Sequence, residues 1–195
     1  MKLCNIPYYL GALINHFIPR NKHLWITGKT TGWGYENSPP MFFDNSKYFF
    51  LYLVNCTQEK VFWICDSEKE VNLLKSMGLP AVNYHSIKGK WLVARAEYSF
   101  HHYGINQLNR ILQFGSIQIN FWHGIPLKKI GYDVNPRPSK QPNILSRYLN
   151  KNGEEYLLSS SEYLSKEIYQ KAFDIDLEHI LDYGYPRTDV LKLNR

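Results

Sequence analysis

The stretch that decides the fold is KVFWICDSEKEVNLLKSMGLPAVNYH, residues 60–85. It opens with KVFWIC (60–65), an apolar run rich in aromatic and β-branched residues that is typical of a buried strand. Ser67 then has the position of a helix N-cap, and Gly78 ends the helical pattern. AVNYH (81–85) reads as a second strand. A strand, a helix and a strand in this order predict a right-handed crossover between parallel strands.

The same alternation continues in both directions along the chain. Further strands are predicted at 23–28, 97–102, 116–121, 155–160 and 179–184. Further helices are predicted at 44–55, 87–93, 105–114, 142–149 and 161–173, with a last short one from about residue 187. Asp44 or Asn45 is the expected N-cap of the helix over 44–55. The pattern indicates an α/β fold, a Rossmann-like and mostly parallel sheet with helices on both faces.

Composition narrows the kind of partner and the kind of site. The 195 residues include 23 Lys and Arg against 17 Asp and Glu, a net charge of +6. This balance favours an anionic partner, which is a phosphate ester, an anionic membrane surface or nucleic acid. The three cysteines are odd in number and form no CxxC pair, which argues against a disulfide framework or a zinc site. The cysteines therefore indicate a reducing compartment. We also expect no metal and no cofactor.

Residues 1–20 form a distinct N-terminal segment with an amphipathic helix predicted over 8–18, ending before Pro19. Its apolar run is interrupted and is shorter than the roughly 20 residues that span a bilayer. Two interpretations remain open. The helix packs on its own domain, or it lies in a membrane interface with the help of Arg20 and Lys22.

Three unusual segments follow predicted strands: 28–40, 122–129 and 184–189. Because ligands of parallel α/β sheets bind at the carboxyl ends of the strands, these segments are expected along one edge. The simpler alternative is that they are ordinary loops, since every α/β domain has strand-to-helix loops on that edge.

WHGIPLKK (122–129) carries the first candidate site residue, His123. Histidine titrates near neutrality, and at a strand-end turn it can act as a general base. Gly124 allows a tight turn or a close approach of a ligand, and Lys128 offers charge for a phosphate. The alternative is a solvated histidine in a turn.

GYPRTD (184–189) has a similar pattern of strand, glycine turn and proline, followed by Arg187 and Asp189. An arginine can hold a phosphate through two hydrogen bonds, and we expect Asp189 to orient Arg187. The alternative is that these two residues form an ion pair at the start of a helix.

Two other motifs contain residue types typical of binding sites but give weaker evidence of function. GKTTGWG (28–34) lacks the first glycine of a P-loop, because position 23 is His23; an amide nest for an anion and a flexible connector both remain possible. His101 and His102 are adjacent, and neighbouring strand residues point to opposite faces, so we expect a structural role and no shared metal.

A family resemblance rests on four motifs in a matching order. WHGIPLKKIGYD resembles the WHGTPLKKIGFD signature of the CDP-glycerol:poly(glycerophosphate) glycerophosphotransferases, the teichoic-acid primase and polymerase group. DNSKYFFLYL (44–53), the segment over 83–104 and YGYPRTDVL (183–191) are also similar to family segments, so the resemblance covers about residues 20–195. The sequence departs from the family at Ile125, Tyr132 and Thr188, where threonine, phenylalanine and asparagine are usual; Ile125 lacks a hydroxyl for a ligand contact.

The resemblance implies a GT-B architecture of two Rossmann-like domains. Residues 21–195 are expected to be the N-terminal, acceptor domain, and the donor-binding C-terminal domain is expected to be absent from this chain. The implied reaction transfers glycerol phosphate or ribitol phosphate from CDP-glycerol or CDP-ribitol to a hydroxyl of a lipid-linked glycan or polymer, of teichoic-acid or capsular type. The implied place is the cytoplasmic face of the plasma membrane, as a peripheral protein on its anionic surface.

The resemblance makes His123 the catalytic base. The expected substrate or phosphate contacts are Gly124, Lys128, Arg187 and Asp189, together with Asn45 and Ser46 of the DNSKY segment. Three other functions remain to be separated: a GT-B glycosyltransferase of surface polysaccharide synthesis, a non-catalytic acceptor-binding half-domain, and a nucleic-acid binder. We expect no nucleic-acid partner, and the oligomeric state is left open.

Overall fold

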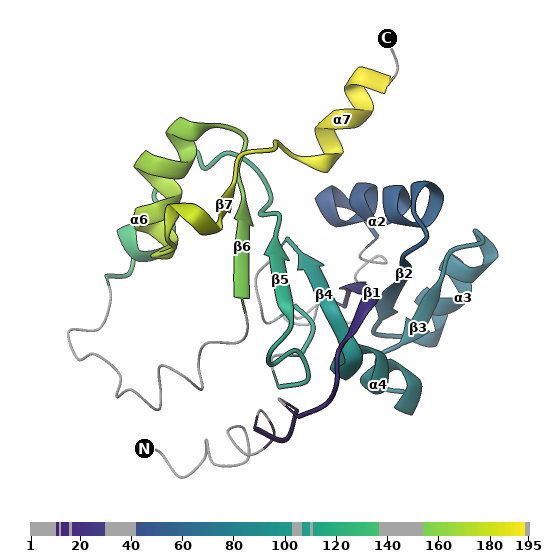
Figure 1. The fold of residues 1–195 in the computed structure, drawn as a ribbon. Coiled ribbons are helices and arrows are strands. Elements are labelled where there is room, and N and C mark those ends of the chain that lie inside the picture. Colours follow the sequence, from purple (N-terminus) through teal and green to yellow (C-terminus); the bar gives the residue numbers. More distant parts are fainter. Residues whose placement is uncertain are drawn as a thin grey trace.

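The computed structural model describes residues 11, 13–15, 17–29, 42–102, 107–109, 111–136 and 154–193. Its centre is one sheet of seven parallel strands in the order β3-β2-β1-β4-β5-β6-β7 (Figure 1). The strands are β1 (Asn21–Gly28), β2 (Lys60–Cys65), β3 (Ala81–Asn83), β4 (Ala96–His101), β5 (Ile117–Asn120), β6 (Glu154–Leu158) and β7 (Ile180–Leu181). The order reverses direction between β1 and β4, as in doubly wound dinucleotide-binding folds. The predicted Rossmann-like α/β fold is confirmed.

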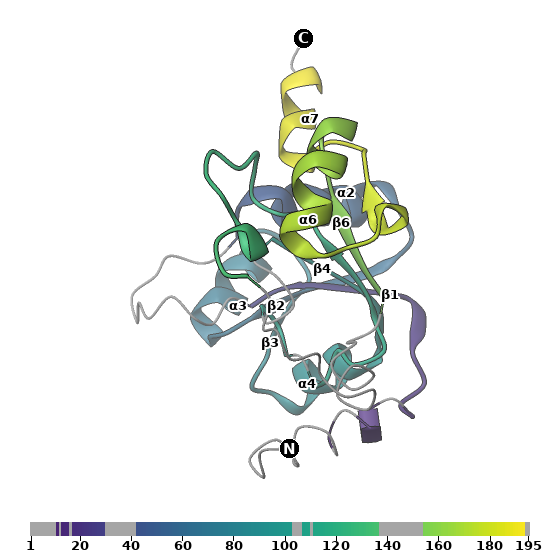
Figure 2. The same ribbon diagram turned by 90° about the vertical axis from the view of Figure 1, so that its left-hand side faces the viewer.

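Helices lie on both faces of this sheet. They are α2 (Asp44–Cys56), α3 (Glu68–Ser76), α4 (Ile87–Arg95), a π-helical turn η3 (Leu164–Tyr169) that continues into α6 (Gln170–Phe173), α7 (Pro186–Leu193), and the short 3₁₀ turns η2 (Gly131–Asp133) and η4 (Leu177–His179). Figure 2 shows the same arrangement from the side, with α2 and α7 toward one end of the molecule and α4 at the other.

The alternation of side chains along β2 explains why helices cover both faces. Trp63 packs with α2 and α3 in one core, whereas Ile64 packs with Val93 of α4 in the other. Trp63, Ile64 and Val93 are fully buried. Because successive strand residues point to opposite faces, one apolar strand supplies both cores.

Several local predictions are confirmed by their hydrogen bonds. The hydroxyl of Ser67 accepts from the backbone N–H of Glu70 at 3.3 Å and caps α3 as expected. Gly78 follows that helix with φ +76°, the left-handed conformation that glycine adopts at helix ends.

Other predicted elements differ from the structure. The helix expected over 105–114 is absent from the described residues of that stretch, which form turns. The side chain of Asn109 accepts from the backbone N–H groups of Ile111 and Leu112, each at 3.0 Å, so it competes with helical bonds. The strand expected over 179–184 shortens to β7, and the helix expected over 142–149 lies outside the described residues.

The start of α2 also differs from prediction. Its N-cap is Phe43, whereas Asp44 and Asn45 are already inside the helix. Asp44 has φ +59°, a left-handed conformation that is uncommon for a residue with a side chain. The side chains of Asp44 and Asn45 are thereby used for long-range contacts, which are described below.

The described part of the N-terminal segment packs on its own domain. The buried Asn15 donates to the backbone oxygen of Leu112 at 2.6 Å, and Arg20 donates to that of Ala96 at 3.0 Å. Burial lowers the pKa of Arg20 to about 10, so this guanidinium serves the fold. Leu13, Ile14 and Phe17 remain exposed. No helix among the described residues has the length and apolar character needed to cross a bilayer.

Candidate functional site

The WHG turn leaves β5 in a conformation that few sequences accept. Trp122 has φ +52° and Gly124 has φ +138°. The side-chain oxygen of Asn120 accepts from the backbone N–H of Trp122 at 3.0 Å, which supports the sharp turn. A Cβ atom at position 124 would lie 3.0 Å from Nη2 of Arg187. The backbone conformation at 124 therefore favours glycine, and a Cβ atom there would also make a tight contact with the end of the Arg187 side chain.

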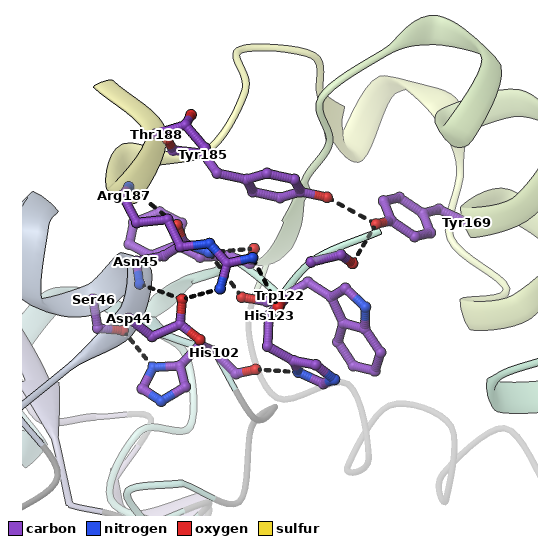
Figure 3. A network of polar contacts seen from close by, with 12 residues as sticks. Asp44, Asn45, Ser46, His102, Trp122, His123, Tyr169, Tyr185, Arg187 and Thr188 are labelled. Atoms are coloured by element: carbon purple, nitrogen blue, oxygen red, sulfur yellow. Dashed lines mark hydrogen bonds and ion pairs between the residues drawn. The ribbon is translucent and has the colours of Figure 1, made fainter. Parts of the chain in front are cut away.

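This turn presents His123 at the carboxyl edge of the sheet, with its side chain exposed. Its Nδ1 lies 3.1 Å from the backbone oxygen of His102, which can only accept a hydrogen bond (Figure 3). Nδ1 must therefore carry the proton in the neutral ring, and Nε2 keeps the lone pair. The indole of Trp122 lies beside the imidazole, with ring centroids 4.0 Å apart.

His102, whose backbone oxygen contacts the His123 ring, is itself held in the core. It is fully buried, and its Nδ1 lies 2.9 Å from the hydroxyl of Ser46. Burial lowers the pKa of His102 to about 4, so its ring is neutral at pH 7. Its neighbour His101 is also buried, and burial lowers the pKa of that ring to about 3. Both histidines are parts of the core, in line with their expected structural role.

Arg187 approaches the turn from α7. Its Nη1 donates to Oδ1 of Asp44 at 2.9 Å, and its Nη2 donates to the backbone oxygen of His123 at 3.1 Å. Its side chain is 37% exposed. Figure 3 shows the guanidinium between Asp44 and His123, so the predicted neighbourhood of His123 and Arg187 is present.

Asn45 connects the same two segments through the backbone. Its amide nitrogen donates to the backbone oxygen of Trp122 at 3.1 Å, and its oxygen accepts from the backbone N–H of Arg187 at 3.2 Å. Asn45 and Ser46 are both fully buried. They were predicted as substrate contacts, but in this structure they hold protein groups in place beneath the turn.

Lys128 and Asp189 are not brought into this network. Both are exposed, and neither side chain makes a hydrogen bond or an ion pair within the described part of the chain. The expectation that Asp189 orients Arg187 is corrected, because the carboxylate on the guanidinium belongs to Asp44.

Two tyrosines that sequence reasoning missed complete the site. The buried Tyr169 lies 3.3 Å from the backbone oxygen of Gly124, to which its hydroxyl donates, and 2.8 Å from the hydroxyl of Tyr185. Burial, and then the hydrogen bond with Tyr185, raise the pKa of Tyr169 well above its usual range. Tyr185 lies in the GYPRTD segment described above, whereas nothing in the local spacing of Tyr169 distinguishes it from other core aromatics.

The glycine-rich segment after β1 is described only as far as residue 29. Gly28 has φ +98°, and Lys29 is buried with its ammonium 4.4 Å from the centre of the Tyr84 ring. Burial lowers the pKa of Lys29. The possible anion nest predicted over 28–34 lies mostly outside the described residues.

Potential metal ligands gather elsewhere. Among the described residues, the grouping of three such side chains is Asp176, Glu178 and His179, in and beside η4. It precedes β7 and so lies at the amino end of that strand, away from the WHG turn.

The chain was compared with known protein families, curated proteins and solved structures. The family profile of CDP-Glycerol:Poly(glycerophosphate) glycerophosphotransferase matches residues 33–195. A teichoic acid glycerol-phosphate transferase of Staphylococcus aureus is 29% identical over 159 residues, covering 78% of this chain and 39% of that protein. A teichoic acid poly(glycerol phosphate) polymerase of Bacillus spizizenii is 26% identical over an alignment of 202 residues, covering 96% of this chain and 47% of that protein.

A solved structure of the wall teichoic acid polymerase TagF has the same fold, with a TM-score of 0.63 and 22% identity. That match covers 99% of this chain and 49% of the polymerase, so the chain spans about half the length of such relatives. The likeness in fold agrees with the Rossmann-like α/β sheet, and the family profile covers the WHG turn and α7. The chain therefore belongs to the CDP-glycerol:poly(glycerophosphate) glycerophosphotransferase family.

Proposed function

We propose that this chain supplies the acceptor side of a polyol-phosphate transfer. The reaction moves glycerol phosphate or ribitol phosphate from a CDP-linked donor to a hydroxyl of a teichoic-acid-like or capsular polymer. The oxygen of that hydroxyl forms a new bond to the β-phosphorus of the donor, the bond from this phosphorus to the bridging oxygen breaks, and CMP leaves.

The observation that carries the proposal is the orientation of His123. Because the backbone oxygen of His102 holds the proton on Nδ1, Nε2 of this exposed residue is the ring nitrogen that accepts a proton in the proposed step. In the proposed step Nε2 takes the hydroxyl proton as the oxygen attacks phosphorus. A positioned general base contributes roughly 10²–10⁴ in rate.

Arg187 supplies charge beside this base. A guanidinium has five N–H donors, and within the described residues Arg187 uses one N–H of Nη1 and one of Nη2. Three remain for the oxygens of a phosphoryl group, next to the turn that carries His123. Cations in this position stabilise the negative charge that develops on phosphoryl oxygens and on the leaving group. Lys128, exposed on the following loop, is proposed as a second and more mobile contact.

The partners belong to the proposal as well. The donor is CDP-glycerol or CDP-ribitol, and the acceptor is a lipid-linked glycan or polymer. We place the protein at the cytoplasmic face of the plasma membrane, as a peripheral protein on its anionic surface. The net charge of +6 and the exposed side chains of Leu13, Ile14 and Phe17 support this placement. Arg20 contributes to it less than expected, because its guanidinium binds backbone oxygens of the domain.

The experiment is a CMP-release assay with the chain joined to the donor-binding half of a family relative, because the chain spans about half the length of such relatives. A synthetic lipid-linked acceptor is supplied with CDP-glycerol or CDP-ribitol in parallel. Release that requires the acceptor and is lost in His123→Gln supports the proposal. Acceptor binding without CMP release, and without sensitivity to His123→Gln, indicates the non-catalytic acceptor-binding function instead. Release from a sugar nucleotide in place of both CDP-polyols indicates a glycosyltransferase.

A further inference from the structure

We infer that Asp44 is a positioning residue, whose carboxylate orients the Arg187 guanidinium so that its remaining N–H groups face a phosphoryl group beside His123. The inference deepens the proposed function and rests on it. It concerns a residue that contacts the guanidinium, and through it the substrate.

The ion pair has the geometry of a fixed contact. Oδ1 of Asp44 lies 2.9 Å from Nη1 of Arg187, although the two residues are 143 positions apart in the chain. The Asp44 side chain is only 10% exposed, whereas that of Arg187 is 37% exposed. One partner is therefore held inside the protein while the other reaches solvent. Such a shielded carboxylate interacts more strongly than one in an exposed surface pair.

The backbone explains how this carboxylate reaches the guanidinium. Asp44 has φ +59°, and the same Oδ1 accepts from the backbone N–H of Asn45 at 2.8 Å. Aspartate tolerates the left-handed conformation better than most residues because its short side chain bonds locally. The carboxylate of Asp44 is thus held by the neighbouring backbone N–H of Asn45 as well as by the guanidinium of Arg187. Residues in sparsely populated conformations cluster at functional sites.

Asn45 performs a different task from Asp44. It binds the backbone N–H of Arg187 and the backbone oxygen of Trp122, and so joins α7 to the WHG turn. Asp44 binds only the side chain of Arg187 across this junction. Substitution of Asn45 is expected to affect folding, whereas substitution of Asp44 is expected to affect the direction of the guanidinium.

Charge and position make opposite predictions for the loss of Asp44. Removal of a negative charge next to an anion site raises anion affinity when the effect is purely coulombic. Loss of a positioning contact lowers it, because the guanidinium becomes mobile and its ordering then opposes binding. The sign of the change therefore separates the two explanations.

The test measures binding of inorganic phosphate to the 195-residue chain at pH 7 by ³¹P NMR titration. Asp44→Gly is the main variant, since glycine accepts the left-handed backbone and removes the carboxylate. Asp44→Asn keeps an acceptor oxygen and is the conservative variant. Glu59→Gln removes one negative charge just before β2, at the amino end of the parallel strands and so on the far side of the sheet from the WHG turn. It is the matched charge control.

We expect Arg187→Ala to weaken phosphate binding roughly tenfold or more. We expect Asp44→Gly to weaken it about three- to tenfold, Asp44→Asn less, and Glu59→Gln by less than about twofold. In the Arg187→Ala background, Asp44→Gly should have no further effect, because both residues act through one group. The N–H order parameter of Arg187 Nε should also fall in Asp44→Gly while the unfolding midpoint changes little.

Three results overturn the inference. The first is a higher phosphate affinity in Asp44→Gly than in the wild type. The second is a loss of phosphate affinity on Asp44→Gly that is as large in the Arg187→Ala background as in the wild type. The third is an unchanged order parameter of Arg187 Nε in Asp44→Gly. If Arg187→Ala itself has no effect on phosphate binding, the proposed phosphate contact of Arg187 fails and the inference fails with it. A loss with Arg187→Ala but none with Asp44→Gly removes the inference and leaves the proposed function standing.

Discussion

The Nδ1 of His123 lies 3.1 Å from the backbone oxygen of His102, so the exposed imidazole of the WHG turn has one defined neutral tautomer. The bond joins the ends of two neighbouring parallel strands, β4 and β5. A backbone oxygen cannot change its role with pH as a carboxylate does. The tautomer is therefore set by the fold, and it leaves Nε2 as the basic nitrogen of a residue at the carboxyl edge of the sheet.

Replacement of His123 tests the proposed base. His123→Gln keeps a side chain of similar reach but removes the basic nitrogen, and CMP release should fall by roughly 10²–10⁴. Because the ring is exposed, the free energy of unfolding should change by less than about 0.5 kcal/mol. The neutral tautomer is checked in the wild type by long-range ¹H–¹⁵N NMR, and a proton found on Nε2 would contradict the assignment.

Asn45→Ala is expected to destabilise the protein strongly. The buried amide serves the backbone oxygen of Trp122 and the backbone N–H of Arg187, and its loss leaves both without this partner. We expect a loss of about 2–3 kcal/mol in the free energy of unfolding, measured with urea. Asn55→Ala is the control on the same helix, since the exposed Asn55 side chain bonds, among the described residues, to the backbone oxygen of Leu51 alone. Equal effects of the two substitutions would refute the special role of Asn45.

Gly124→Ala should be more costly than an ordinary glycine substitution. Gly78 has a positive φ and nothing within 4 Å of an added Cβ, so Gly78→Ala measures backbone strain alone, about 1 kcal/mol. At position 124 the added Cβ also approaches Nη2 of Arg187 to 3.0 Å. Gly124→Ala should therefore lose more unfolding free energy than Gly78→Ala and should also weaken phosphate binding. Normal phosphate binding in Gly124→Ala would mean that Arg187 moves aside freely.

The buried His102 predicts a loss of stability in acid. Its pKa is about 4 in the folded protein because of burial, below the ordinary value of 6.5 that applies after unfolding. Between these values the unfolded chain binds a proton that the folded chain does not, so stability falls as the pH is lowered from 6.5 to 4. At pH 5 the contribution of His102 is a loss of roughly 2 kcal/mol relative to neutral pH.

The measurement for His102 is urea unfolding at pH 7.5 and pH 5.0, in the wild type and in His102→Asn. The difference between the two pH values should be smaller in His102→Asn by about the same amount. His23→Asn is the control, since that histidine is exposed and pairs only with Glu59 among the described residues. The buried His101, with its pKa lowered to about 3, is expected to leave part of the difference in place. A difference as large in His102→Asn as in the wild type would contradict the contribution of His102.

Tyr169→Phe tests the support beneath Gly124. The substitution keeps the ring but removes the hydroxyl that contacts the backbone oxygen of Gly124 and the hydroxyl of Tyr185. We expect about 1–2 kcal/mol of destabilisation together with reduced CMP release. Tyr163→Phe, at an exposed position of the same helical segment, should be neutral. Full activity in Tyr169→Phe would show that the WHG turn keeps its shape without this contact.

Local sequence pattern was sufficient to predict the parallel sheet and the closeness of His123 and Arg187 at its carboxyl edge. KVFWIC and AVNYH, separated by a helix with a Ser67 cap and a terminal glycine, indicate a parallel unit, and repetition of that unit gives the Rossmann-like fold. The carboxyl-edge rule then placed His123 and Arg187 near each other, as they are in the structure. Prediction failed over 105–114, where Asn109 bonds to nearby backbone N–H groups that a helix would use.

What the sequence alone determined is the succession of strands and helices along the chain and the residue types that follow the strands, because both are read from local periodicity and turn chemistry. Only the tertiary structure decided which groups hold the site: Asp44 in place of Asp189 on Arg187, the backbone of His102 behind His123, and Tyr169 under Gly124. The physical reason is sequence separation. These contacts join residues 143, 21 and 45 positions apart, and their geometry depends on how the chain crosses between strands.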